Sequence, residues 1–173
     1  NQVSKTKRAC RYLLDCAIGK VEGETDLKAV WSDPAVNGGN NPLEAKLGGS
    51  GLGLVALISM NGIAPGFVDL KDVQALGRFI VFMQKPDGSF YSKYTPSRGV
   101  RCDDWVSLYY PGEAALGLLM LYEMDASDEW LNSAYRALAF LAESRKGSEY
   151  VPADHWALLA TAKLFSLDVN PSV

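Results

Sequence analysis

The chain has 173 residues, of which 48% are hydrophobic and 21% charged, and its formal net charge at pH 7 is -3. This length and composition predict one soluble globular domain, residues 1–173, with a substantial core. The negative charge argues against a nucleic acid or an anionic membrane surface as the main partner, because both bind to basic faces. No apolar run of about twenty residues predicts a helix that spans a membrane.

The three cysteines, Cys10, Cys16 and Cys102, are an odd number, and the first two occupy core-facing positions of one predicted helix. This pattern favours free thiols over a disulfide framework, and the lack of a basic-then-apolar leader favours a cytoplasmic protein. The first residue is Asn rather than Met, so we expect the native start to lie upstream and the chain to be part of a longer one.

Six segments are predicted to be helical. In chain order they cover residues 4–19, 42–61, 70–85, 111–125, 127–144 and 153–167. The first, third and fifth are amphipathic, whereas the second, fourth and sixth are apolar almost all the way round, which is typical of helices covered by protein on every side. The alternation predicts an all-α domain of three outer–inner helical hairpins with the apolar helices inside.

The second predicted helix carries Gly48, Gly49, Gly51 and Gly53. Each glycine costs a helix about 0.5–1 kcal/mol relative to alanine, so we expect the inner helices to approach one another closely there. As an alternative, the Gly51-x-Gly53 spacing loosely fits a dinucleotide-binding turn. No βαβ pattern surrounds it, so we predict no nucleotide and no other cofactor.

Each apolar helix is predicted to begin with a proline two residues before an acid, and these acids are Glu44, Glu113 and Asp154. One interpretation is structural, because proline and an acid are favoured in a first helical turn and Asn41 with Glu44 forms a capping box. Glu113 fits this interpretation less well, since Tyr110 is a poor N-cap. In the other interpretation, the three acids meet at a common rim.

The fourth and fifth helices carry a pattern of their own. It consists of Leu121-Tyr122-Glu123, Asp128, Trp130-Leu131, Ala134 and residues 136–141. These residues resemble the hairpin repeat of the α/α-toroid superfamily, which includes six-hairpin glycosidases, sugar epimerases of the N-acylglucosamine type and isoprenoid cyclases. Residues 84–90 are similar to a Gln…Gly-x-aromatic turn of the same superfamily.

Full toroids have more hairpins than the three predicted here, so the resemblance implies an arc or half of an α/α toroid. The other half is then outside these residues, or is supplied by a copy of the chain or by another domain. The resemblance also implies a ligand cavity at the end of the toroid axis where the inner helices begin. The residues expected at this rim are Glu44, Asp103, Asp104, Trp105, Tyr109, Tyr110, Glu113, Asp154, His155 and Trp156.

Acids and aromatic rings at such a rim suit a saccharide. Two carboxylates can divide the cleavage of a glycosidic bond between acid and base, and Trp and Tyr faces pack well on sugar rings. We predict that Glu113 is one of this pair, with a pKa that burial raises. Its partner is one of Asp103, Asp104 or Asp154, and His155 is a supporting base.

Two groups of charged residues allow other interpretations. Asp103 and Asp104 fit a solvated turn or a divalent-cation site, but adjacent side chains point in different directions and a lone histidine gives no zinc site, so we predict no metal. Lys93, Arg98 and Arg101 lie in the long loop after Phe90, where they either bind an anionic sugar or are solvated.

The leading hypothesis is a carbohydrate-processing domain that hydrolyses or epimerises a saccharide. The first alternative is a non-catalytic helical-repeat module in which Trp105, Tyr109, Tyr110 and Trp156 grip a glycan or a partner protein. A weaker alternative is an isoprenoid cyclase-like toroid, which requires an apolar cavity and therefore does not fit the acids at the rim.

Overall fold

The computed structural model describes residues 1–37 and 42–167. Its helical elements are α1 (Gln2–Tyr12), the π-helical turn η1 (Leu13–Ala17), α2 (Pro34–Asn37), α3 (Leu47–Ile63), α4 (Leu70–Phe82), α5 (Tyr110–Asp125), α6 (Asp128–Arg145) and α7 (His155–Ser166). Its strands are β1 (Ile18–Lys20), β2 (Lys28–Ser32), β3 (Glu44–Lys46), β4 (Lys93–Thr95) and β5 (Val100–Cys102). All six predicted helices are present, and the first two differ most in their bounds.

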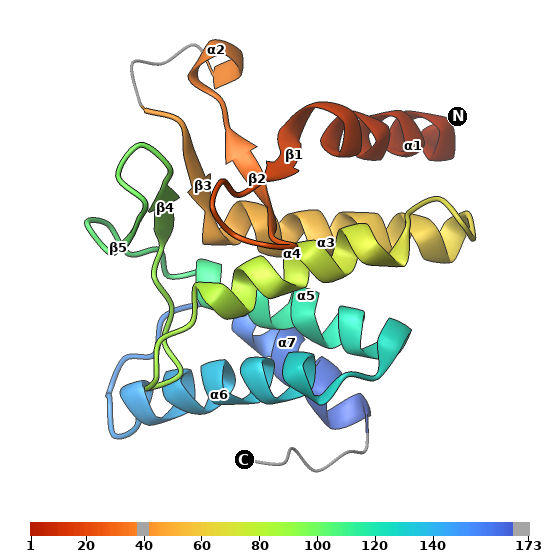
Figure 1. The fold of residues 1–173 in the computed structure, drawn as a ribbon. Coiled ribbons are helices and arrows are strands. Elements are labelled where there is room, and N and C mark those ends of the chain that lie inside the picture. The colour runs from red at the N-terminus through yellow and green to blue at the C-terminus, as the bar shows by residue number, and fades with distance from the viewer. Residues whose placement is uncertain (38–41, 168–173) are drawn as a thin grey trace.

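The long helices pack around α5, which contacts α3, α4, α6 and α7. Figure 1 shows that α3, α5 and α7 begin at the side of the molecule that carries β3, β4 and β5, and that α4 and α6 run back toward this side. The buried residues of α5 extend almost continuously from Gly112 to Leu121, as its apolar sequence predicts. The first turns of the three apolar helices therefore lie at one edge of the fold.

Glycines allow the apolar helices to cross in close contact. A Cβ atom at Gly51 of α3 would lie 2.7 Å from the backbone carbonyl carbon of Glu113 in α5. A Cβ atom at Gly112 of α5 would overlap the backbone of Ala157 in α7. Side chains at these positions would hold the helix axes apart, so the glycines have the packing role that the sequence predicted for Gly51.

The prediction of an all-α domain is wrong in one respect, because the fold also contains a five-stranded antiparallel sheet in the order β1-β2-β3-β4-β5. Ala45 at its centre pairs with Trp31 of β2 on one side and with Tyr94 of β4 on the other. The strands have three to five residues each. Such short segments show too little two-residue alternation to be told from loops or helix ends by sequence.

The sheet has two unlike faces, because successive side chains of a strand point in opposite directions. On the inward face, the ring centroid of Tyr94 lies 6.2 Å from that of Trp31 and 6.4 Å from that of Phe79. The other face is polar. Its residues include Glu44, Lys46, Lys93, Thr95 and Cys102.

The second predicted helix begins at Leu47 rather than at residue 42. Glu44 therefore lies in β3 and does not cap a helix, while its predicted capping partner Asn41 lies outside the described residues. The physical reason is that residues 44–46 pair with strands on both sides. The sheet thus supplies backbone partners that a helical turn would otherwise provide.

The first predicted helix is also interrupted. It ends as an α-helix at Tyr12 and continues as η1, before the chain enters β1. Cys10 is buried as predicted, but Cys16 in η1 is exposed, because a π-helical turn contains more residues than an α-helical turn and shifts the side chains that follow. The described cysteines are free thiols.

One side of α7 is open, which differs from the prediction of a helix covered on every side. Ala157 and Ala160 are its buried residues. Leu158 and Phe165, on the opposite side, are 71% and 80% exposed. None of the helices in the described residues is long and apolar enough to cross a membrane.

Candidate functional site

Glu113 is a buried carboxylate in the first turn of α5 and is only 6% exposed. The absence of a side chain at Gly48 of α3 makes room for it, because a Cβ atom there would overlap both Glu113 Oε2 and the Tyr110 ring. Among the residues that the structure describes, none donates a hydrogen bond to Oε2. A buried oxygen without a partner is costly, so this position is unusual for a residue with only a structural role.

The electrostatic surroundings favour the protonated form of Glu113. Burial raises the pKa of its carboxyl above the ordinary value, and the negative charge of Asp154 raises it further. The pKa of the Tyr110 hydroxyl is raised by burial and then by the charges of Glu113 and Glu44. The charges of Glu44, Glu113 and Asp154 therefore act on one part of the molecule, around Tyr110 and the Glu113 carboxyl.

Asp154 is committed to structural contacts at the start of α7. Its Oδ1 accepts a hydrogen bond of 3.0 Å from the backbone N–H of Ala157, which makes it the N-cap. Its Oδ2 accepts one of 2.6 Å from Arg145 of α6, so the carboxylate is buried and ion-paired. Asp154 thus fixes the position of α7 while its charge acts on Glu113.

The polar face of the sheet lines a pocket of about 380 Å³, which we call the sheet pocket. Its charged residues are Glu44, Lys46, Lys93, Arg98 and Asp104. Glu44 is buried at its base, with Oε1 3.4 Å from Lys46 Nζ and Oε2 3.4 Å from Lys93 Nζ. Strand pairing brings the two lysines together, because Lys46 lies opposite Lys93 in the β3–β4 register.

The aromatic residues predicted at the rim form two small groups. Trp105 meets Tyr110 edge to face, with ring centroids 5.5 Å apart. His155 lies between Tyr109 and Trp156, with its ring centroid 5.3 Å and 5.1 Å from theirs. Both groups belong to the starts of α5 and α7 or to the loop before α5, so they flank the same edge as Glu113.

Two predicted site residues are turned to other partners. Arg101 donates a hydrogen bond of 2.5 Å to the carbonyl of Phe82 and lies over the Phe82 ring, because its place in β5 directs it to the inward face, away from Arg98. Asp103 is ion-paired with Lys85 and accepts a hydrogen bond from the backbone N–H of Ser92. Within the described part of the chain, no group of three or more His, Cys, Asp or Glu side chains could hold a metal ion.

Lys46 lines the sheet pocket but is not among the site residues that the sequence predicts. The sequence predicts a helix start at residues 44–46, whereas they form a strand in which Ala45 is buried between two charged neighbours. This polar–apolar–polar alternation is the only sequence signal for the strand, and it extends over only three residues. Lys93 belongs to the predicted basic loop, but its position beside Glu44 depends on the pairing of β3 with β4.

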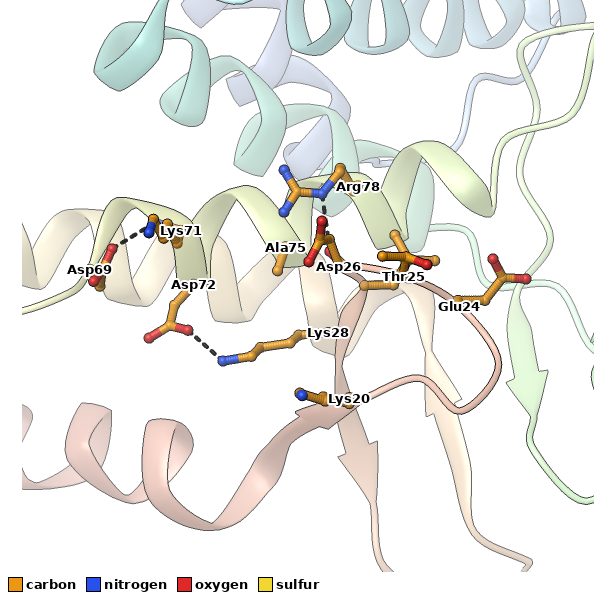
Figure 2. Close-up of a pocket in the computed structure, with 11 residues that line it drawn as sticks. Lys20, Glu24, Thr25, Asp26, Lys28, Asp69, Lys71, Asp72, Ala75 and Arg78 are labelled. Carbon is orange, nitrogen blue, oxygen red and sulfur yellow. Dashed lines mark hydrogen bonds and ion pairs between the residues drawn. The ribbon is translucent and has the colours of Figure 1, made fainter.

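A larger pocket, of about 730 Å³, lies elsewhere, between the β1–β2 connection and α4. Figure 2 shows four basic and four acidic side chains around it, namely Lys20, Lys28, Lys71 and Arg78 with Glu24, Asp26, Asp69 and Asp72. Lys28 forms an ion pair with Asp72 at 2.5 Å, and Arg78 donates a hydrogen bond to the backbone carbonyl of Asp26. The charges balance, and this pocket contains none of the predicted site residues.

Comparison with known proteins gives a structural match without a sequence match. No family model matches the chain, and no curated protein matches it. A solved structure, the selenomethionine derivative of a GH76 alpha-mannanase from Bacteroides thetaiotaomicron, matches over 96% of the chain with a TM-score of 0.76 and 15% sequence identity. The chain spans 46% of that protein. It therefore has a helical fold like part of an α/α-toroid glycoside hydrolase, and β3, β4 and β5 of its sheet lie at the edge where α3, α5 and α7 begin.

Proposed function

We propose that the chain is a carbohydrate-processing domain that hydrolyses glycosidic bonds, with Glu113 as the general acid. The observation that carries the proposal is the buried carboxyl of Glu113 at the common edge of the apolar helices, whose Oε2 has no hydrogen-bond partner among the described residues. A general acid must still hold its proton near neutral pH, and the raised pKa of Glu113 supports this role. The structural likeness to an alpha-mannanase supports a saccharide as substrate.

Asp104 is the best candidate for the second carboxylate. It is exposed and lines the sheet pocket, and no described residue forms an ion pair or hydrogen bond with its carboxylate. Asp103 and Asp154, in contrast, are ion-paired with Lys85 and Arg145. An exposed carboxylate that lines a pocket is accessible to water and to a bound sugar, and is thus suited to activate water or attack the sugar.

We also propose that the rim works within a complete ring. The chain spans about half of the mannanase, and the open apolar side of α7 is suited to pack against a further inner helix. That helix comes from a second copy of the chain or from another segment. The mass of the protein in solution distinguishes a self-associating chain from one that remains a monomer.

The activity test compares the wild-type chain with Glu113→Gln, which keeps the shape and removes the proton. Alpha-mannan and other polysaccharides are incubated with each protein, and the released reducing ends are measured. We expect the variant to lose at least about a hundredfold in rate, as for loss of a general acid. Glu143→Gln, on the exposed side of α6, is the matched control and keeps full activity. Undiminished turnover by Glu113→Gln would contradict the assignment of Glu113 as the general acid. If the products are epimerised rather than hydrolysed saccharides, the chain is an epimerase and not a hydrolase.

A further inference from the structure

The sheet pocket carries more positive than negative charge, although the chain as a whole is negative. Lys46, Lys93 and Arg98 are its basic residues, and Glu44 and Asp104 its acidic ones. The formal net charge of the chain is -3. A local excess of positive charge on an acidic protein attracts anionic ligands to one place rather than to the whole surface.

The basic groups in the sheet pocket retain hydrogen-bonding capacity. Glu44 is 3.4 Å from each lysine, which is longer than the roughly 2.7–2.9 Å of a strong charge-assisted hydrogen bond. No described residue accepts a hydrogen bond from the Arg98 guanidinium. Lys93 and Arg98 can therefore bind a further carboxylate without breaking a tight ion pair.

The sheet pocket continues into the aromatic part of the rim. Lys93 Nζ lies 6.0 Å from the centre of the Trp105 ring, and Trp105 is 51% exposed. Tyr110 then lies edge to face against Trp105 and shares its surroundings with Glu113 and Glu44. One path thus runs from the basic groups, over a partly open aromatic face, to the proposed general acid.

We infer that the saccharide bound at this site carries a carboxylate, as a uronic acid does. Its carboxylate lies against Lys93 and Arg98, and the apolar face of its ring packs on Trp105. The inference rests on the proposed function in that it names the class of saccharide for the same site. A neutral mannan has no carboxylate to bind Lys93 and Arg98.

The test uses pairs of probes that differ only in charge. Oligogalacturonate and oligomannuronate are compared with their methyl esters, which keep the sugar backbone and lose the negative charge. Calorimetric titration of the wild-type chain is expected to show binding of one free acid at least about tenfold tighter than its ester, and weaker binding of the acid at high salt. This comparison needs no variant, so it does not depend on the folding of one.

A double variant, Lys93→Gln with Arg98→Gln, then locates the effect. We expect it to lose about tenfold or more in affinity for the free acid and to bind the ester as the wild type does. The control, Lys5→Gln with Arg8→Gln, makes the same change in net charge on the exposed surface of α1 and keeps the preference. Equal binding of acid and ester, absence of binding to all four probes, or the same loss in the control would overturn the inference.

Turnover separates this inference from the proposed function. If the chain hydrolyses a neutral polysaccharide, if this activity requires Glu113, and if the chain does not prefer the free acid to its ester, the uronic-acid inference is refuted and the proposed function stands. Selective binding of the free acid without turnover of any saccharide refutes the proposed hydrolysis and leaves the inference in place.

Discussion

Glu113 shows how one residue can be both unfavourable for folding and suited to chemistry. Its carboxylate is buried beside Tyr110, and the charge of Asp154 disfavours its ionised form. A glutamate that only began a helix would be more stable in water, where its negative charge is solvated and still interacts with the helix dipole. The burial therefore has a cost, and that cost depends on pH.

Replacing Glu113 by Gln should change the pH dependence of stability. Because the pKa of Glu113 is raised in the folded state, the folded chain still holds a proton that the unfolded chain has released above its ordinary pKa of about 4.3. The wild type therefore loses stability as pH rises from that value through the raised pKa. Gln has no proton to lose, so we expect Glu113→Gln to gain stability relative to the wild type between acid and neutral pH.

Urea unfolding at a series of pH values measures this difference. Glu143→Gln is again the control, because its carboxylate is exposed on α6 and its replacement should leave the wild-type pH dependence in place. A constant difference between Glu113→Gln and the wild type over the whole range would show that Glu113 does not bind a proton preferentially in the folded state.

The close crossing of α3 and α5 determines where Glu113 lies in the fold. Gly51 lets the two helix backbones meet, since an added Cβ atom would lie 2.7 Å from backbone atoms of Glu113 and Ala114. Backbone atoms cannot rotate away as a flexible side chain can, so the helices would have to separate. The glycine-rich start of α3 thus sets the depth at which Glu113 lies.

Gly51→Ala should destabilise the fold, whereas Gly62→Ala in the same helix should not. We expect Gly51→Ala to cost about 1–3 kcal/mol, because overpacking forces backbone shifts. Gly62 has open space around it, so alanine there should add about 0.4–1 kcal/mol of stability by reducing the freedom of the unfolded chain. Chemical denaturation of both variants measures the two effects, and an equal effect of the two substitutions would contradict the close crossing.

At the scale of the whole molecule, the apolar helices differ in how far the rest of the fold covers them. α5 is surrounded by other helices, and its Leu118 is 0% exposed. In α7, Ala157 and Ala160 are buried, whereas Leu158 and Phe165 face outward. Both α5 and α7 are apolar, but α5 is a core helix whereas α7 has an exposed apolar side, because only α5 has neighbouring helices on both sides.

Leu118→Ala and Leu158→Ala test this difference with the same chemical change. In the isolated chain, we expect Leu118→Ala to lower the free energy of unfolding by about 2–5 kcal/mol, because it leaves a cavity in the core. Leu158 is 71% exposed, so Leu158→Ala should change it by less than about 0.5 kcal/mol. A large loss from Leu158→Ala, found by thermal or chemical unfolding, would show that the open side of α7 is covered in solution.

The sequence predicted the helical part of the fold well, because each helix has an apolar pattern long enough to be recognised. The bounds of α4, α5, α6 and α7 lie within a few residues of those expected. Gly88, in the turn after α4, takes a positive φ of 90°, which glycine adopts readily. The sheet was missed since its strands are short and since the partners of Ala45 lie far from it in the sequence.

For the site, the sequence by itself determined which acids stand near the starts of the apolar helices, because each of these segments has a proline two residues before an acid. Only the tertiary structure decided their environments. In it, Asp154 forms an ion pair with Arg145, Glu44 lies in a strand within 3.4 Å of two lysines, and Glu113 is buried with no partner for Oε2 among the described residues. The reason is that burial and charge pairing arise from contacts between segments distant in sequence, which helical periodicity does not encode.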